Sequence, residues 1–562
     1  MNETSETGNS AEEHEIDRHL LAFPINVRSV LKHLRQDMRD DWFVDALEYA
    51  EIFDAPKNLV SVVQAILSEN NGQYQSGGRF AYDIPKTNLG LRYALETDFY
   101  DRFLYQAIAS YLIPFYDPLL SNRVLGHRFN SEYRSEKYIF KHRIELWNTF
   151  QGMTKLALDS DDALLVTDLI NYFENITVDS IINALVDNLP NVTASGIEKN
   201  RIRNAIHTLE SLLNKWCYSE RHGLPQNRDA SSFLANIVLN KVDRKMVAMG
   251  YDYFRYVDDI RIICKDENHA RQALNNLIRE LRTVGLNINS SKTTVLTKQS
   301  TADQINDHFP SYDDRILAID NMWKSRSRRV IARSIPLIQQ LLNDLVTNGQ
   351  SQSRQFRFCI NRLQTMIQSG VFDCSSILTP TVEKILLDQL YSQPASTDFF
   401  CKILSSMKPG SAIFSKVERF LLNSGLSIHS WQNFNLWMML ATVGHNSSLL
   451  VEKAKSQIMR DILAADVPAM FIYLGKLGNT DAIAELIPYF SENWPYQHRR
   501  FFLVAAQNID GIRLRPLIEK LGPRLEGTLK RIRENKGITN PFLHRTQPGN
   551  VLDIFNRVSP YD

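Results

Sequence analysis

The stretch YFRYVDDIRIIC, residues 253 to 264, sets two adjacent carboxylates between two short apolar runs. Side-chain types alternate on both sides of the pair, as they do in strands, so the pattern predicts a hairpin with Asp258 and Asp259 at its tip. Arg255 and Arg261 are expected to point away from the apolar face. Two carboxylates this close repel each other and lose solvation, which is costly unless a cation lies there. Asp-Asp is also an acceptable turn pair, so an ordinary surface hairpin is the alternative interpretation.

The segment LLVTDLINYFENI, 164 to 176, places Asp168 at the end of a predicted buried strand and two aromatic residues, Tyr172 and Phe173, shortly after it. This segment resembles motif A of the reverse-transcriptase palm, and RYVDDI resembles motif C, the Tyr-x-Asp-Asp signature of the same enzymes. Further segments resemble the fingers block of retron and group II intron enzymes, motif B and motif D, at 84 to 129, 222 to 243 and 284 to 293. The tetrapeptide alone is a weak signal, whereas five blocks in the family's order are a strong one.

The resemblance implies nucleotidyl transfer with two divalent cations, which lie roughly 3.5 to 4 Å apart in such sites. Magnesium is the expected ion, with manganese as the alternative, because magnesium takes oxygen ligands from carboxylates, phosphates and water. Asp168 and Asp258 are predicted to supply the bridging carboxylates. Asp259 is the third candidate, although alternation along the strand would allow it to face away. A strand-end or N-cap aspartate is the alternative interpretation of Asp168.

The resemblance also assigns substrate contacts. Lys86 and Arg92 take the places of the fingers cations that grip the triphosphate, and arginine suits bidentate phosphate contact. A solvated charged strand is the alternative for both. Phe173 takes the place of the steric gate, a ring that closes off the ribose 2′ position and so favours deoxynucleotides, with core packing as the alternative. Tyr256 is expected beneath the primer end, or else in the core.

The motif B block departs from the family at one position. The family usually has Pro-Gln-Gly, whereas this chain has Pro225, Gln226 and Asn227. Glycine there lets the backbone approach the nascent base pair or adopt a positive φ, and asparagine is the next most tolerant residue. The departure puts the usual geometry for template-directed synthesis in doubt. Gln226 remains a candidate substrate-binding residue. Lys292, in the motif D position, is a candidate general acid for pyrophosphate, with a surface lysine as the alternative.

A chain of 562 residues is long enough for two or three domains, because single cores rarely exceed roughly 250 to 300 residues. Strand signals fade after residue 300, where short apolar-striped segments end at Gly, Asn or Pro without a strict repeat period. The predicted fold class is α+β, a reverse-transcriptase fingers–palm domain of the right-hand polymerase type followed by an all-α, HEAT-like helical-hairpin domain with a thumb-like start. The predicted domains are a disordered tail and helical extension, fingers and palm, and helical array, at 1–75, 76–305 and 306–562.

Local patterns predict two elements of the palm in detail. Residues 163 to 169, ALLVTDL, form a continuous apolar run that predicts a buried strand. Residues 269 to 286 carry an apolar stripe at helical spacing, and Gly285 stands just past its end as a predicted C-cap.

Composition limits the partners. A net charge of +1 provides no global basic field, so any nucleic-acid surface must be local. The segment KSRSRR, 324 to 329, with Arg333, lies where a thumb would track a nucleic-acid backbone, and a solvated helix face is the alternative. The five scattered cysteines, the polar N-terminus and the lack of a long apolar run predict a soluble cytoplasmic protein without membrane contact.

A palm followed by a long helical region most resembles the abortive-infection and related defence-associated reverse transcriptases of bacteria. This resemblance implies DNA synthesis from dNTPs in antiphage defence and assembly into a homo-oligomer. In several members the synthesis is untemplated or is primed by a tyrosine hydroxyl. Priming by tyrosine leaves the DNA product covalently attached to the protein. The alternatives are a conventional enzyme that copies a dedicated non-coding RNA template, and a non-enzymatic phage-sensing scaffold, against which the intact carboxylates speak. The apolar run 434 to 440 is expected in a self-association contact or in the core.

Overall fold

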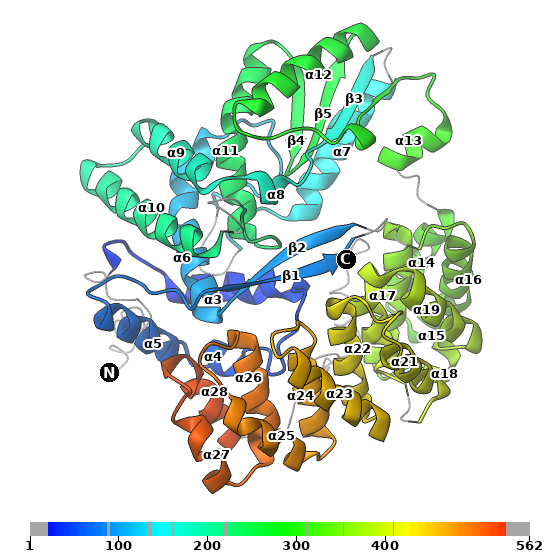
Figure 1. The fold of residues 1–562 in the computed structure, drawn as a ribbon. Coiled ribbons are helices and arrows are strands. Elements are labelled where there is room, and N and C mark those ends of the chain that lie inside the picture. Colours follow the sequence, from blue (N-terminus) through cyan, green and yellow to red (C-terminus); the bar gives the residue numbers. More distant parts are fainter. Residues whose placement is uncertain are drawn as a thin grey trace, which may run out of the picture. The chain divides into compact units, whose positions relative to one another are not determined.

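A computed structural model of the chain describes residues 21–86, 90–132, 138–159, 162–217, 223–309, 313–351, 353–407 and 410–534. The tail predicted to be disordered, residues 1 to 14, lies outside these ranges. The chain divides into two compact units (Figure 1). The first consists of Met1–Asp41, Ile52–Ala81 and Leu95–Ser311, and the second of Trp42–Glu51, Tyr82–Ala94 and Tyr312–Asp562.

A four-stranded antiparallel sheet, in the order β4-β5-β3-β6, forms the centre of the first unit. Its strands are β3 (Ala163–Asp168), β4 (Asp252–Tyr256), β5 (Asp259–Cys264) and β6 (Thr294–Leu296). Every residue of β3 is buried, because β5 and β6 pair with its two edges and helices pack against the sheet. The predicted strand at 163 to 169 and the predicted hairpin are both confirmed.

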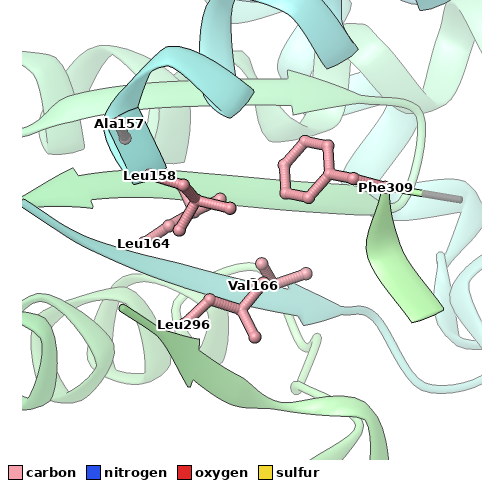
Figure 2. Packing of buried hydrophobic residues seen from close by; sticks show 6 residues of the cluster. All are labelled: Ala157, Leu158, Leu164, Val166, Leu296 and Phe309. Carbon is pink, nitrogen blue, oxygen red and sulfur yellow. The ribbon is translucent and has the colours of Figure 1, made fainter. Parts of the chain in front are cut away.

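Two helices, α7 (Arg143–Asp159) and α12 (Glu267–Arg282), pack against this sheet. Figure 2 shows the apolar cluster that α7 forms with β3, β6 and the residue after α13, made of Ala157, Leu158, Leu164, Val166, Leu296 and Phe309. The helix predicted at 269 to 286 is confirmed over most of its length. Gly285 follows it with a φ of +75°, the left-handed backbone that glycine adopts without strain.

The first unit contains further helices before, between and after these strands in the chain. They are α3 (Val27–Asp37), α5 (Pro56–Glu69), α6 (Phe99–Tyr116), α8 (Tyr172–Asn175), α9 (Val178–Asn188), α10 (Gly196–Trp216), α11 (Asp229–Ala248) and α13 (Ala302–His308). Helix α8 follows β3 and α11 precedes β4, so each adjoins a strand that leads to a candidate aspartate. The short 3-10 turn η5 (Ser290–Lys292) precedes β6.

The β4–β5 hairpin lies in the interior, which contradicts the surface-hairpin alternative. β5 is flanked by β4 and β3, and Arg255 and Arg261 are 0% and 4% exposed. Arg255 pairs with Asp243 of α11, with Nη2 2.6 Å from Oδ2. The Arg261 guanidinium lies 4.6 Å from the ring centroid of Phe150 and 4.5 Å from that of Phe309. The register pairs Arg255 with Ile260 and Phe254 with Arg261, so the two arginines lie on opposite faces of the hairpin. The expectation that both point away from one apolar face is therefore wrong, and both faces of the hairpin are buried.

The second unit is mainly helical. Its helices are α14 (Asp314–Lys324), α15 (Arg328–Ala332), α16 (Ser334–Thr347), α17 (Arg354–Gln368), α18 (Cys374–Ile377), α19 (Pro380–Ser392), α20 (Thr397–Leu404), α21 (Ala412–Leu422), α22 (Ser430–Val443), α23 (Ser448–Arg460), α24 (Val467–Lys476), α25 (Thr480–Leu486), α26 (Tyr496–Ala505), α27 (Gly511–Ile518) and α28 (Pro523–Glu534). From α20 to α28 each even-numbered helix packs against the next even-numbered helix, and α21, α23 and α25 pack against α22 or α24. The assignment to a HEAT-like class stays a prediction. Within the described ranges, no helix has both the length and the apolar character of a membrane span.

Two short segments from the front of the chain belong to the second unit. Arg500 of α26 holds the first, since its Nε lies 2.6 Å from Asp45 Oδ2 and its Nη1 contacts Glu51. Phe43 joins both segments to α22, because its ring centroid lies 5.3 Å from that of Tyr82 and 5.1 Å from that of Phe434. The sequence-based boundaries put these segments in the N-terminal extension and the fingers, since local patterns do not reveal a partner 455 positions away.

The apolar run 434 to 440 lies in α22, and each of its residues is at most 1% exposed. Helices α20 and α24 pack against α22. The run is therefore core, and its alternative interpretation as a self-association contact is wrong.

Strands β1 (Arg79–Pro85) and β2 (Leu91–Thr97), in the segment predicted to form the fingers, make a separate two-stranded sheet. The turn end of this sheet, residues 82 to 94, is the second of the two segments that group with the helical unit. One of the points at which the chain passes from one unit to the other falls within the short helix α4 (Ala50–Phe53).

Candidate active site

The three candidate aspartates lie at the same end of the central sheet. Asp168 ends β3, and Asp258 lies in the two-residue turn between β4 and β5. The register pairs Asp168 with Asp259, the first residue of β5. Direct cross-strand partners have their side chains on the same face, with Cβ atoms roughly 4.5 to 5.5 Å apart. Asp259 therefore does not face away from Asp168, as strand alternation had allowed.

The electrostatics of this group favour a bound cation. Burial is the main cause that raises the pKa of Asp259 to about 7, and the charges of Asp258 and Asp168 also raise it. The cations Arg261 and Lys292 act in the opposite direction. Carboxylates that oppose one another's ionisation in this way gain most from a cation placed between them.

Lys292 ends η5 and pairs with Asp168, although its side chain is 64% exposed. Its Nζ lies against Asp168 Oδ2. Burial alone would lower the pKa of Lys292, but its hydrogen bond to Asp168 and the charges of Asp258 and Asp259 raise it. The backbone N of Asn289 donates to the Asp168 carbonyl at 2.7 Å, which ties this segment to the end of β3. The role of Lys292 as a general acid stays a prediction.

Phe173 and Gln226 lie where the motif A and motif B segments meet. Phe173, in α8, is half-buried, and its ring centroid lies 4.9 Å from that of the buried Tyr172. The Phe173 carbonyl accepts a hydrogen bond from Leu224 N at 2.8 Å. Gln226 Nε2 donates to Glu174 Oε1 at 3.1 Å. Tyr172 is thus the core aromatic residue of the pair, and the partly exposed ring of Phe173 remains open to another contact.

Asn227 adopts the backbone that the usual glycine would favour. Its φ is +56°, in the left-handed region that asparagine tolerates better than most residues. The Arg228 Nη1 donates to the Asn227 carbonyl at 2.9 Å. Arg228 itself pairs with Asp41 and Glu96, at 3.3 and 3.1 Å. The motif B loop is therefore held by a buried cation, and the departure from glycine leaves its backbone conformation accessible.

Tyr256 ends β4 and is the partner of Asp259 in the β4–β5 register. Its ring centroid lies 5.0 Å from that of Trp147 and 6.0 Å from that of Phe150, both in α7. Its hydroxyl donates to the Arg143 carbonyl at 3.1 Å. The ring is half-buried and anchored to α7, so it has both the packing of a core residue and a partly open surface.

Lys86 and Arg92 flank the turn between β1 and β2, and Lys86 N donates to the Gly90 carbonyl at 2.7 Å. Both lie in the segment that groups with the second unit, whereas the three aspartates lie in the first. Their contact with a triphosphate at the aspartates stays a prediction.

The donor set fits magnesium by its chemistry. Among the described residues, no three or more His, Cys, Asp or Glu side chains already converge as they would around an ion, and Asp168 is engaged by Lys292. Asp168 and Asp259 nevertheless offer carboxylate oxygens from paired strands, with Asp258 in the adjoining turn, and such oxygens are the ligands that magnesium takes in proteins.

Sequence reasoning missed the polar residues that adjoin the turn. Asn236 and Asp243 of α11, and Arg255 of β4, are all 0% exposed and bonded to one another or to the turn. A charged residue in an otherwise apolar strand was the available signal, because a buried charge requires a buried partner.

A four-stranded antiparallel sheet with carboxylates at the adjoining ends of two central strands is the arrangement of a polymerase palm domain. Residues 84–358 match the family model described as reverse transcriptase (RNA-dependent DNA polymerase). The chain therefore contains a reverse transcriptase domain, and the enzyme class predicted from the sequence, an RNA-directed DNA polymerase, is confirmed.

No curated protein matches the sequence. Among solved structures the chain is similar to telomerase from Candida albicans in complex with the TWJ fragment of telomeric RNA, with 10% identity and a TM-score of 0.29, over 66% of this chain and 70% of that one. It is also similar to apo telomerase from Candida tropicalis, with 12% identity and a TM-score of 0.30, over 74% and 67% of the two chains. Scores this low support no conclusion, so the family match carries the assignment.

Proposed function

We propose that the domain makes DNA from dNTPs by two-metal nucleotidyl transfer at Asp168, Asp258 and Asp259. The observation that carries this proposal is the sheet register, which pairs Asp168 with Asp259 beside the turn that bears Asp258. The raised pKa of Asp259 indicates that the group is costly without a cation. A purely structural sheet end has no need of three adjoining carboxylates.

Magnesium is the proposed ion, with manganese as the alternative. Asp168 and Asp258 would hold it, with Asp259 as a third ligand, together with phosphate and water oxygens. When bound, two such ions would activate the primer 3′ oxygen and neutralise the leaving pyrophosphate. Lys292 is the proposed proton donor to that pyrophosphate, and its contact with Asp168 keeps it near the reaction.

The remaining candidates are proposed to bind substrate. Phe173 selects deoxyribose, for which its half-buried position leaves ring surface available. Gln226 and Tyr256 support the nascent pair and the primer end. Lys86 and Arg92 grip the triphosphate, as the fingers cations of similar enzymes do.

The biological role that we propose is bacterial antiphage defence, with DNA synthesis that is untemplated and primed from a tyrosine hydroxyl, in a homo-oligomer. The helical unit that follows the palm supports this role. RNA-templated synthesis on a dedicated non-coding RNA is the second candidate, and the left-handed backbone of Asn227 favours it, because this backbone is the one a glycine would supply.

Incubation of the purified protein with each dNTP and Mg²⁺, with and without nuclease pretreatment, tests the proposal. Sequencing of the product and mass spectrometry for DNA attached to the protein distinguish the two candidates. Attached homopolymeric DNA that survives pretreatment supports the untemplated, protein-primed activity. Products that match a co-purified RNA and vanish after RNase support templated synthesis. No incorporation in any arm contradicts the polymerase proposal and favours a non-enzymatic scaffold.

A further inference from the structure

The turn that carries Asp258 has a strained backbone. Val257, the residue before Asp258, has a φ of +56°. A β-branched residue in the left-handed region is a genuine outlier, and such a conformation persists only where its surroundings impose it. The contacts of this turn must therefore supply the constraint.

Arg255 supplies the first contact. Its Nη1 donates to the Val257 carbonyl at 2.8 Å and to Asn236 Oδ1 at 2.7 Å. The rest of the guanidinium is fixed by Asp243, which accepts from Nε at 2.9 Å and from Nη2 at 2.6 Å. Tyr253 donates its hydroxyl to the same Asp243 Oδ1 at 2.8 Å. One end of the guanidinium is thus clamped to α11, and the other end holds the turn.

Gly126 supplies the second contact. A Cβ atom on Gly126 would lie 2.9 Å from both Val257 Cγ2 and Val257 N, so only glycine permits this approach. Asn236 holds Gly126 in place, because its Nδ2 donates to the Gly126 carbonyl at 2.9 Å. Asn236 therefore links both contacts, one through Arg255 and one through Gly126.

The energetics of the cluster favour a positioning role over a stabilising one. The side chains of Arg255 and Asp243 are both 0% exposed. The desolvation cost of a buried ion pair commonly cancels its Coulombic gain, so apolar residues would stabilise the fold at least as well. Apolar residues, however, could not donate the hydrogen bond that fixes the position of the Val257 carbonyl.

We infer that Asn236, Arg255 and Asp243 are positioning residues that hold Val257 in its left-handed conformation and thereby fix the Asp258 carboxylate for metal binding. The inference rests on the proposed function, since it assigns to Asp258 a metal ion as its ligand. None of the three touches the reacting atoms. Their effect on the site passes through the backbone of the turn.

Asn236→Ala in the full-length protein tests the inference, with Asn240→Ala as the matched control. Asn240 is also buried in α11, at 3% exposed, but its Nδ2 donates to the Leu119 carbonyl at 3.3 Å, away from the turn. Each variant removes one buried amide donor, but Asn236 also accepts from Arg255 Nη1 at 2.7 Å, so Asn236→Ala is expected to lose more thermal stability than the control, and metal binding is the measurement that decides. Binding of Mn²⁺ is measured from the electron paramagnetic resonance signal of the free ion, and the Mg²⁺ concentration for half-maximal dNTP incorporation is measured alongside.

We expect Asn236→Ala to weaken Mn²⁺ binding about tenfold, in the range that residues supporting metal ligands show, and Asn240→Ala to leave it unchanged. Equal Mn²⁺ binding by wild type and Asn236→Ala, with binding lost in Asp258→Asn, would overturn the inference and leave the proposed function intact. Equal Mn²⁺ binding by wild type and Asp258→Asn, with no dNTP incorporation by the wild-type protein, would instead refute the proposed function. If Asn236→Ala does not fold, Gly126→Ala provides the second variant, because its methyl group displaces Val257 without removing a polar group. It must weaken Mn²⁺ binding for the inference to stand.

Discussion

Asp258 and Asp259 can be tested together because neither is a packing residue. We predict that Asp258→Asn with Asp259→Asn abolishes nucleotide incorporation while the fold stays intact. The asparagine pair keeps the shape of the turn and removes the like charges that, after burial, raise the pKa of Asp259. Thermal unfolding without metal at pH 8 should therefore show a midpoint no lower than that of wild type. Incorporation at the wild-type rate by the double variant is the result that contradicts the polymerase site.

Phe173 should control the choice of sugar. We predict that Phe173→Ala admits ribonucleotides, narrowing the preference for dATP over rATP by about tenfold or more, because the ring no longer closes off the 2′ position. The comparison is the ratio of kcat/KM for the two nucleotides. Tyr172→Phe is the control, since Tyr172 is the buried neighbour of Phe173. An unchanged ratio in Phe173→Ala would mean that the ring is not a gate.

Asp466 gives the helical unit a predictable pH dependence. Its carboxylate is 4% exposed, accepts one long hydrogen bond from Asn433 Nδ2 at 3.4 Å, and has a pKa raised to about 6 by burial. The folded protein therefore holds this proton between about pH 4 and pH 6, where the unfolded chain has lost it, so the stability contributed by Asp466 falls as the pH rises through that window and stays low above it. Asp466→Asn should raise the unfolding free energy at pH 8 by about 1 to 3 kcal/mol and have little effect near pH 4.

Denaturant unfolding at several pH values measures this difference, and Asp481→Asn, on the exposed end of α25, is the control for removing one negative charge. A pH-independent difference between Asp466→Asn and wild type would contradict the assignment.

At the scale of elements, the segment from the end of α14 through α15 is the local basic surface that the sequence predicts. Lys324, Arg326, Arg328, Arg329 and Arg333 are all exposed, and Arg328 Nη2 also donates to the Val371 carbonyl at 2.7 Å. A cationic surface binds nucleic acid through phosphates and releases counterions, so its contribution depends on salt.

Changing four of these cations to glutamine should weaken nucleic-acid binding and reduce the slope of log affinity against log salt by up to about 3. Arg328 is left unchanged because its hydrogen bond to Val371 is structural. The variant carries substitutions at Lys324, Arg326, Arg329 and Arg333, and the control carries the same charge change at Lys416, Arg419, Arg460 and Arg515, which are also exposed. Equal slopes for the two variants would identify the segment as a solvated helix face.

At the scale of the whole molecule, the helical unit includes two segments from the front of the chain, Trp42–Glu51 and Tyr82–Ala94. Truncation at about residue 310 removes Arg500, the partner of Asp45 and Glu51, and removes Phe434, against which Phe43 packs. We predict that the truncated protein exposes apolar surface and unpaired carboxylates and is poorly soluble. A soluble, monomeric truncated protein as active as the full chain would contradict this.

Light scattering on the intact protein tests the predicted homo-oligomer, which requires a particle larger than 64.7 kDa.

Local chemistry determined much of the site from the sequence. The strand before Asp168, the hairpin with the paired aspartates, and the left-handed backbone at Gly285 all follow from side-chain alternation and from the steric limits on φ. These constraints act within a few residues, so a single sequence expresses them fully.

Only the tertiary structure decided which residues became partners. The register that pairs Asp168 with Asp259 and the burial of Arg255 against Asp243 depend on contacts between segments far apart in the chain. The same is true of Arg500, which holds Asp45 across 455 positions. Side-chain periodicity says that a face is buried but not what buries it, because that choice is made by the packing of whole elements against one another.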